Sequence, residues 1–214
     1  MPRRARWTAF CAVLFALLQI THAAADSSAG KTPNQVIEAL QVCLLEVMKN
    51  AETLGFEGRV ETLGPVLPEV FDLGFMAEKS VGRHWKTASP EDQQRLVATF
   101  TRYIVANYAG RFTGWDGQKF EIQGDEPSAR GTMLVLTHLL DPNRETVSLD
   151  YRLRKTDESG WQIIDVYLDG TVSELALRRS EYSALIKREG FQALLAKLDE
   201  RIETLASEPP EEAS

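Results

Sequence analysis

The chain has 214 residues, of which 24 are basic and 31 acidic, so its formal net charge is −7, and 43% of its residues are hydrophobic. This excess of acidic side chains argues against nucleic acid as a partner and against electrostatic docking on anionic lipid headgroups. The length suits one domain with a sizeable core.

The first 25 residues have the order of a secretory signal peptide. Three arginines lie within the first six residues, and the uncharged, mostly apolar segment 7–20 follows them. Ala23 and Ala25 place small side chains where a signal peptidase reads, so we expect cleavage between Ala25 and Asp26. An uncleaved anchor is the alternative, but the apolar segment is shorter than the ~20 residues that a spanning helix needs. Residues 1–25 contain three of the 24 basic residues and none of the 31 acidic ones. The chain after cleavage therefore has 21 basic and 31 acidic residues and a net charge of −10.

The predicted domain covers residues 33–205, between a polar tail at 26–32 and an acidic, proline-bearing tail at 206–214 that we expect to be disordered. Pro33 can begin a helix. Only Cys43 remains after cleavage, so no intramolecular disulfide can form, and we expect this cysteine to be a small core residue of that helix. The apolar positions of the helix recur at steps of three and four: Val36, Ile37, Leu40, Leu44, Val47 and Met48.

Two further helices are predicted before Gly110, where the spacing of the apolar residues changes. A short one covers 68–81, although Gly74 weakens it. The other has a clear start, because Ser89 can cap it and Pro90 suits the first helical position. We expect this helix to continue to about residue 109, where Gly110 ends it.

After Gly110 the apolar residues alternate, which predicts strands. The expected strands cover 119–123, 131–140, 147–154 and 161–168, and turn residues at 141–143 and 157–160 separate the last three. From residue 173 the helical period returns in two segments that Gly190 divides. Helices, an antiparallel sheet and again helices predict an α+β domain: a curved sheet of at least four strands with helices packed on it.

Catalytic and metal-binding motifs are missing from the sequence. His84 and His138 are far apart and have no ligand-type residues at metal-binding spacing. One alternative hypothesis is a small enzyme in which Asp165 or Asp150 acts in a pocket beside His138. Against it, Asp150 alternates with apolar residues and is expected to face water. Another alternative is an interaction module with a filled core and an exposed apolar patch.

Several short segments of the chain form an ordered set. The first is VGRHWKTASP at 81–90, followed by a helix rich in Phe and Tyr. The others are DPN at 141–143, LDYRL at 149–153, GWQIIDV at 160–166, RSEY at 179–182 and GFQALL at 190–195. In their order and spacing these segments resemble the MlaC or toluene-tolerance family, and the likeness covers roughly residues 33–202. The segment DGTVS at 169–173 departs from the common pattern and looks like the hopanoid-associated HpnM branch.

This resemblance implies a periplasmic lipid carrier that is not an enzyme and needs no cofactor or metal. Such a carrier, expected to be a monomer, takes a phospholipid or hopanoid between an outer-membrane lipoprotein complex and an inner-membrane ABC transporter complex with an MCE-domain protein. The bulky apolar residues on the elements around the ligand are the expected lipid contacts: Phe71, Phe75, Phe100, Ile104, Tyr108, Leu134, Leu136, Tyr151 and Leu168.

Four basic residues near the C-terminal helices are candidates for docking to an acidic partner surface: Arg178, Arg179, Lys187 and Arg188. Arg178 and Arg179 could also hold a phosphate or carboxylate. The alternative is that they pair with Glu174 or Glu181 on one helix face and keep it solvated.

Overall fold

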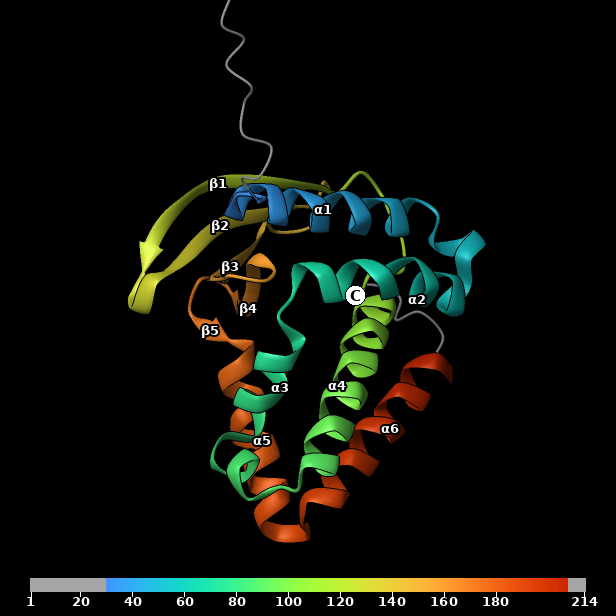
Figure 1. The fold of residues 1–214 in the computed structure, drawn as a ribbon. Helices are drawn as coiled ribbons and strands as arrows, with labels where there is room; N and C mark the ends of the chain where they lie inside the picture. The colour runs from blue at the N-terminus through green and yellow to red at the C-terminus, as the bar shows by residue number, and fades with distance from the viewer. Residues whose placement is uncertain (1–29, 208–214) are drawn as a thin grey trace, which may run out of the picture.

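The computed structural model describes residues 30–207, so the expected signal peptide at 1–25 and the last seven residues lie outside the described part. Residues 30–207 form six α-helices and one five-stranded antiparallel sheet (Figure 1), which confirms the expected α+β class. Within residues 30–207, no helix is both long and apolar enough to cross a membrane.

Helix α1 (Pro33–Lys49) begins where the sequence predicts. The Thr32 side chain accepts a hydrogen bond from the Gln35 backbone N–H, and the Gln35 side chain accepts one from the Thr32 N–H, so two otherwise unpaired amides are satisfied. The apolar side of α1 is buried, including Cys43. Burial and, less, the nearby Glu46 raise the pKa of the Cys43 thiol. Cys43 is therefore the core residue that the pattern indicates.

Helix α2 (Ala51–Val70) was not predicted, and the helix expected at 68–81 is two elements. Gly55 bends α2 at a positive φ of 60°, and Pro65 and Pro68 lie inside it. These residues interrupt the apolar period that marks a helix in sequence. Helix α3 (Leu73–Val81) begins after α2 ends, because the Asp72 side chain caps it by accepting from the Phe75 N–H at 3.0 Å.

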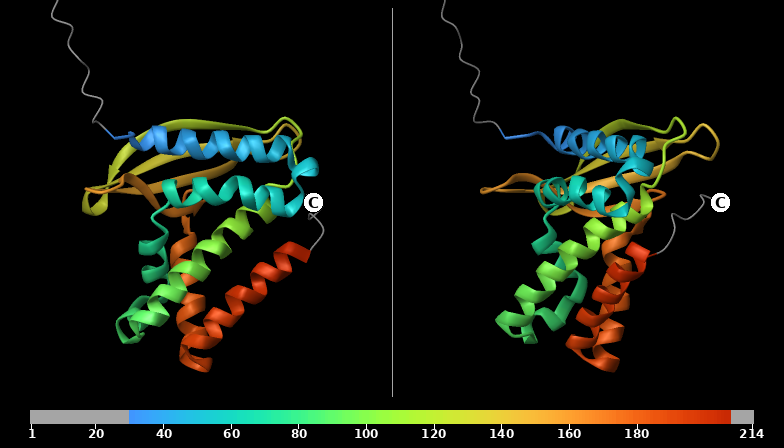
Figure 2. Two further views of the ribbon diagram at one scale, coloured as in Figure 1. Left: turned by 45° about the vertical axis from the view of Figure 1, so that its right-hand side comes forward. Right: turned by 90° about the vertical axis from the view of Figure 1, so that its right-hand side faces the viewer.

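Helix α4 (Pro90–Arg111) follows a short 3₁₀ turn, η1 (Gly82–Thr87). Ser89 caps it as predicted, accepting from the Asp92 N–H at 3.1 Å. The helix continues through Gly110 to Arg111. Together with α5 (Glu174–Glu189) and α6 (Phe191–Ser207), α4 runs away from the sheet as a helical layer (Figure 2).

The sheet has the strand order β1-β2-β3-β4-β5 and is antiparallel throughout. Its strands are β1 (Lys119–Ser128), β2 (Thr132–Leu140), β3 (Val147–Thr156), β4 (Gly160–Leu168) and the two-residue β5 (Val172–Ser173). A register shift between Ile122 and Gly124 lets β1 continue five residues beyond its expected end at 123. The 3₁₀ turn η2 (Ala129–Gly131) joins β1 to β2.

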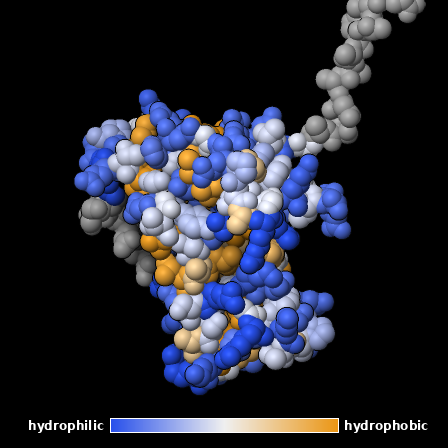
Figure 3. Space-filling model, turned by 90° about the vertical axis from the view of Figure 1, so that its left-hand side faces the viewer, coloured by the Kyte–Doolittle hydropathy of each residue, from blue (hydrophilic) through white to orange (hydrophobic). Residues whose placement is uncertain are grey.

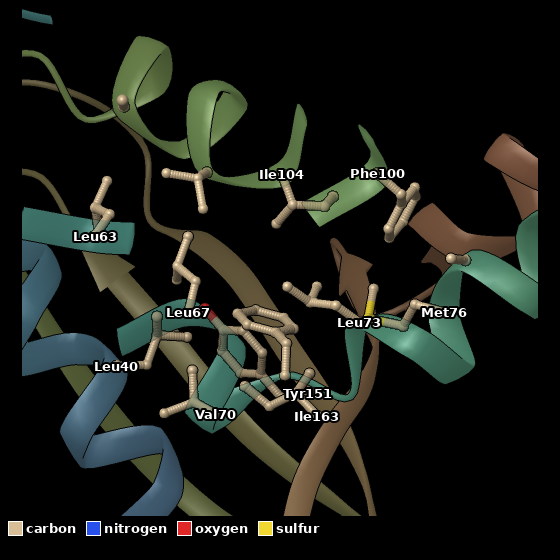
Figure 4. Close-up of a cluster of buried hydrophobic side chains, with 14 of the residues drawn as sticks. Leu40, Leu63, Leu67, Val70, Leu73, Met76, Phe100, Ile104, Tyr151 and Ile163 are labelled. Atoms are coloured by element: carbon tan, nitrogen blue, oxygen red, sulfur yellow. The ribbon is translucent and has the colours of Figure 1, made fainter. Parts of the chain in front are cut away.

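The two faces of the sheet differ in their surroundings. Val135, Tyr151 and Ile163 belong to the buried core that the helices share. Figure 4 shows Tyr151 and Ile163 among these core side chains. Their neighbours Leu134 and Arg152 are paired in register and therefore point to the opposite face. We call the first face the inner face and the second the outer face.

Arg59 of α2 ties two helix ends together inside the protein. Its Nε donates to the Ala109 carbonyl at 2.8 Å, near the end of α4, and its Nη1 donates to the Ala51 carbonyl at 3.1 Å. Because Arg59 is only 6% exposed, no water can replace both bonds easily.

We expect Arg59→Met to lower the free energy of unfolding by about 2–4 kcal/mol, because two buried helix-end carbonyls lose a charged donor. Urea denaturation of the purified variant measures the change. Arg95→Met, which removes an exposed arginine that bonds Gln192, is the control and should change stability by less than about 0.5 kcal/mol. Equal losses in both variants would contradict the assigned role of Arg59.

Candidate functional site

A cavity lies between the inner face of the sheet and helices α3, α4 and α5. In Figure 4, Ile104 and Phe100 point from α4 toward Leu73, Met76 and Tyr151 on the other side. The cavity encloses about 70 Å³. Its lining is mostly apolar and comprises Phe71, Met76, Ile104, Asn107, Tyr108, Arg111, Phe112, Leu149, Tyr151, Val166, Leu168, Glu174 and Arg178.

An aromatic series extends from the cavity toward β1. The rings of Phe71 and Tyr108 meet edge to face at 5.7 Å, those of Tyr108 and Phe112 stack at 5.7 Å, and Phe112 lies 6.3 Å from Phe120. Such rings supply a large apolar surface with few rotatable bonds. This wall of the cavity is therefore suited to flat contact with a hydrocarbon chain.

Arg178 lines the cavity, and neighbouring polar side chains fix its guanidinium in place. Its Nη1 donates to the Tyr103 hydroxyl at 3.1 Å, and its Nη2 lies 3.3 Å from a Glu174 carboxylate oxygen. Burial disfavours the charged form, but the Tyr182 and Tyr103 hydroxyls raise the pKa of Arg178 above its ordinary value. The guanidinium therefore stays charged beside an apolar space, an arrangement that suits an anionic group at the end of an apolar ligand.

Five of the nine expected lipid contacts line this cavity: Phe71, Ile104, Tyr108, Tyr151 and Leu168. The other four lie elsewhere. Phe100 is fully buried in the core, Phe75 packs between the cationic groups of Arg154 and Lys79, and Leu134 and Leu136 are half-buried on β2. Leu136 is two residues from Leu134 and shares its outer face, so neither leucine points to the cavity.

The four expected docking residues also separate. Arg178 is inside, with its side chain only 11% exposed, and pairs with Glu174 as the alternative hypothesis had it. Arg179, Lys187 and Arg188 are exposed, and Arg188 pairs with Glu189 at 2.7 Å. Arg178 therefore does not belong to a surface that a protein partner could reach.

The acids of the enzyme hypothesis are engaged in hydrogen bonds. Asp165 accepts from the backbone N–H groups of Val166 and Leu175 at 2.9 and 3.0 Å and from the Ser173 hydroxyl at 2.6 Å, so it anchors the start of α5. Asp150 accepts from the Thr137 N–H at 3.1 Å. Neither carboxylate lines the apolar cavity.

The expectation that Asp150 faces water was wrong, because Asp150 is only 6% exposed. The turn after β4 covers it: the Asp169 N–H donates to the Ser148 carbonyl, and Gly170 lies beside the carboxylate. Within residues 30–207, no three His, Cys, Asp or Glu side chains are grouped closely enough to hold a metal ion.

Several residues that line the cavity were not predicted from the sequence. Leu149 and Val166 share the strand parity of Tyr151 and Leu168, so alternation alone could have indicated them. The remaining ones, Met76, Asn107, Arg111, Phe112 and Glu174, come from helices or their ends, and only the packing of α3, α4 and α5 brings them together.

Comparisons with known proteins give a family and a common fold. A family model described as "MlaC protein" matches residues 38–200. The intermembrane phospholipid transport system binding protein MlaC of Haemophilus influenzae is 24% identical over 138 residues, which are 63% of this chain; the match spans 64% of that relative's length. A solved structure of a phospholipid-binding protein from Ralstonia solanacearum, in complex with a phospholipid, is 24% identical with a TM-score of 0.69. That match covers 80% of this chain and 97% of the other, and it shows a common fold.

Tyr151, at the centre of the inner face, gives a prediction about stability at high pH. Burial raises its pKa well above the ordinary tyrosine value, and Tyr108 and Asp150 add to this effect. The folded protein therefore keeps a proton that the unfolded chain releases above about pH 10. We expect the free energy of unfolding to fall by up to about 1.4 kcal/mol per pH unit in that range because of this one group.

Urea denaturation at about pH 9 and about pH 11, below and above the ordinary tyrosine pKa, measures this loss. Tyr151→Phe has no proton to lose at this position, so its stability should fall less steeply between the two pH values. An equally steep fall in the variant and the original protein would contradict the buried, protonated state of Tyr151.

Proposed function

Because the chain belongs to the MlaC protein family, we propose that it binds a membrane phospholipid without covalent chemistry and carries it through the periplasm. The observation that carries this proposal is the cavity between sheet and helices, which is apolar along its walls and has the charged Arg178 in its lining. The two relatives, one the binding protein of a phospholipid transport system and the other solved in complex with a phospholipid, support the same ligand class.

A protein carrier is needed because a free phospholipid crosses water poorly. Some thirty methylene groups at ~0.8 kcal/mol each give a barrier on the order of 25 kcal/mol for a diacyl lipid. A carrier lowers this barrier by replacing water with apolar side chains. It needs no reactive group, only a dry space and a polar opening.

We infer that the acyl tails lie against the rings of Phe71, Tyr108 and Tyr151, between Ile104 and Leu168. The phosphate then lies toward Arg178, whose planar guanidinium can bond two oxygens at once. In this arrangement the tails occupy the aromatic wall and the charge remains at the polar residues of the lining.

The cavity must widen to accept such a ligand. Pockets for drug-sized ligands measure roughly 300–1,000 Å³, whereas this cavity encloses about 70 Å³. One wall consists of side chains of α3, α4 and α5, and these helices approach the sheet at one end of the helical layer (Figure 2). We propose that these helices move apart from the sheet when a lipid enters.

A hopanoid is the other ligand that the sequence suggests. The segment 169–173 carries the likeness to the HpnM branch, but none of its residues lines the cavity. We therefore keep a phospholipid as the proposed ligand, because its phosphate would match Arg178. The proposed partners remain an outer-membrane lipoprotein complex and an inner-membrane ABC transporter complex with an MCE-domain protein.

Native mass spectrometry and lipid extraction of the protein, purified from the periplasm of a diderm bacterium, test the proposal. We expect a complex with one diacyl phospholipid. A hopanoid in its place would refute the ligand assignment and preserve the carrier. A protein that is always free of lipid and takes none from vesicles would refute both.

Filling the cavity should prevent loading. We expect Ile104→Trp to lower the phospholipid content about tenfold, equivalent to about 1.4 kcal/mol of binding free energy, because the indole occupies the space of the tails. Leu136→Trp adds the same side chain on the outer face and should load normally. Lipid content per protein is measured after exposure to phospholipid vesicles, and thermal melting checks that both variants fold. Normal loading of a folded Ile104→Trp protein would refute the assigned position of the tails.

A further inference from the structure

A second, wider hollow lies across the sheet from the apolar cavity. It encloses about 990 Å³ and is open to solvent between η2, the outer face of β3 and β4, and helices α3 and α5. In Figure 3, strongly hydrophilic surface borders apolar surface in the waist between the sheet layer and the helices. Six cationic side chains line this hollow, which we call the basic groove: Lys79, Arg130, Arg152, Arg154, Lys155 and Arg179.

Acidic side chains neutralise only part of this charge. Asp165 is the one acid in the groove lining, and its oxygens are bound by Ser173 and two backbone N–H groups. Arg154 pairs with Asp72, and Lys79 with Glu78 at 2.5 Å. The other four cations form no ion pair within residues 30–207: Arg130, Arg152, Lys155 and Arg179.

Arg152 is held in place without an acceptor. Its guanidinium lies over the Tyr167 ring at 5.1 Å, and its buried Nε has no hydrogen-bond partner in the described part of the chain. Its cross-strand neighbour is Asp165, the acid that already anchors α5. Because Arg152 lines the groove and has no ion pair within residues 30–207, a carboxylate in the groove could bind its guanidinium without displacing another acid.

Arg179 lies close to the backbone at Gly82. This glycine has a positive φ of 56°, and a Cβ there would lie 2.9 Å from the Arg179 Nε. The absence of a side chain at Gly82 leaves room for the arginine. Arg179 is the one expected docking residue that lines the groove. Lys187 and Arg188 lie about 12–14 Å farther along α5 at 1.5 Å per residue.

The groove and the apolar cavity share two walls. On α5, Glu174 and Arg178 line the cavity, while Leu175 and Arg179 line the groove. On β4, Val166 lines the cavity and Tyr167 lines the groove. A molecule seated in the groove would therefore touch the elements that must move for the cavity to open.

Charge and shape favour a protein as the occupant. The exported chain has a net charge of −10, which repels an anionic bilayer surface, yet this groove is locally cationic. The cations come from four elements, α3, η2, β3 and α5, so a single phosphate cannot satisfy them all, whereas carboxylates spaced along a segment can. Phe75, Ile164 and Leu175 add apolar surface between the charges.

We propose that the basic groove binds an extended, acidic segment of a partner protein, with carboxylates against the unpaired cations and an apolar side chain against Leu175. This inference deepens the proposed function, on which it rests, because a carrier must dock where it collects and releases lipid. Binding should be steered by charge and weaken as salt rises.

The test uses a fluorescein-labelled peptide of alternating glutamate and leucine, and its glutamine and leucine counterpart, in fluorescence anisotropy with the full exported protein. We expect only the acidic peptide to bind, and more weakly when salt rises from about 0.01 M to about 0.1 M, which shortens the screening length from ~30 to ~10 Å. Removing two exposed groove cations, by Arg130→Gln with Lys155→Gln, should weaken binding about tenfold. Arg152→Gln should weaken it as well.

The matched control is Arg102→Gln with Lys197→Gln, which removes one arginine and one lysine from α4 and α6 and should bind the acidic peptide normally. Equal binding of the two peptides, or equal losses in groove and control variants, would overturn the proposal. A third measurement is sedimentation of the protein with vesicles of equal parts phosphatidylglycerol and phosphatidylcholine. If the original protein and the control variant sediment with these vesicles and the groove variant does not, the groove binds a lipid surface and the proposal is overturned. Lipid content is measured in every variant. If the lipid content is normal but the two peptides bind equally, only the groove assignment is overturned. If lipid is absent but the acidic peptide still binds, the proposed function is overturned.

Discussion

The apolar inner face of β3 and β4 has to be covered, and the rest of the structure depends on how this is done. Tyr151, Leu153 and Ile163 on this face are almost fully buried. Helices α1 and α2 lie along the sheet, but α4 and α5 approach it with their ends and then run away from it (Figures 1 and 2). Helices in this orientation cannot cover the face as fully as helices that lie flat on it. The space left at the junction is the apolar cavity.

Strand β4 and helix α5 separate the apolar cavity from the basic groove. Strand residues alternate between faces, so β4 places Val166 against the cavity and Tyr167 against the basic groove. Helix α5 does the same with successive residues. Asp165 fixes the junction, because its carboxylate binds the first turn of α5 from the neighbouring strand. This carboxylate therefore orients both sites. Because its oxygens are already hydrogen-bonded, it does not neutralise the groove cations, which remain available to a partner.

The sequence predicted the elements with strong local signals. Ser89 and Pro90 fixed the start of α4, and the alternation of β3 is plain because its outer positions are polar. The sequence could not show α2, since Gly55, Pro65 and Pro68 break its period, nor the second half of β1, which follows a register shift. For β2 the inner face was ambiguous, because both faces are largely apolar, and the expected contacts Leu134 and Leu136 proved to be on the outer one. The burial of Asp150 depends on a turn twenty residues later, which no local pattern contains.

We propose that lipid tails enter between α4 and the inner face of the sheet. A phospholipid with a photoreactive diazirine at the end of one acyl chain tests this most directly, after loading, irradiation and mapping of labelled peptides by mass spectrometry. We expect the label on α4 around Ile104 and Tyr108, and on β3 or β4 at Tyr151 or Leu168. Label concentrated on the outer face, at Leu134 and Leu136 or around Arg152, would contradict this position of the tails.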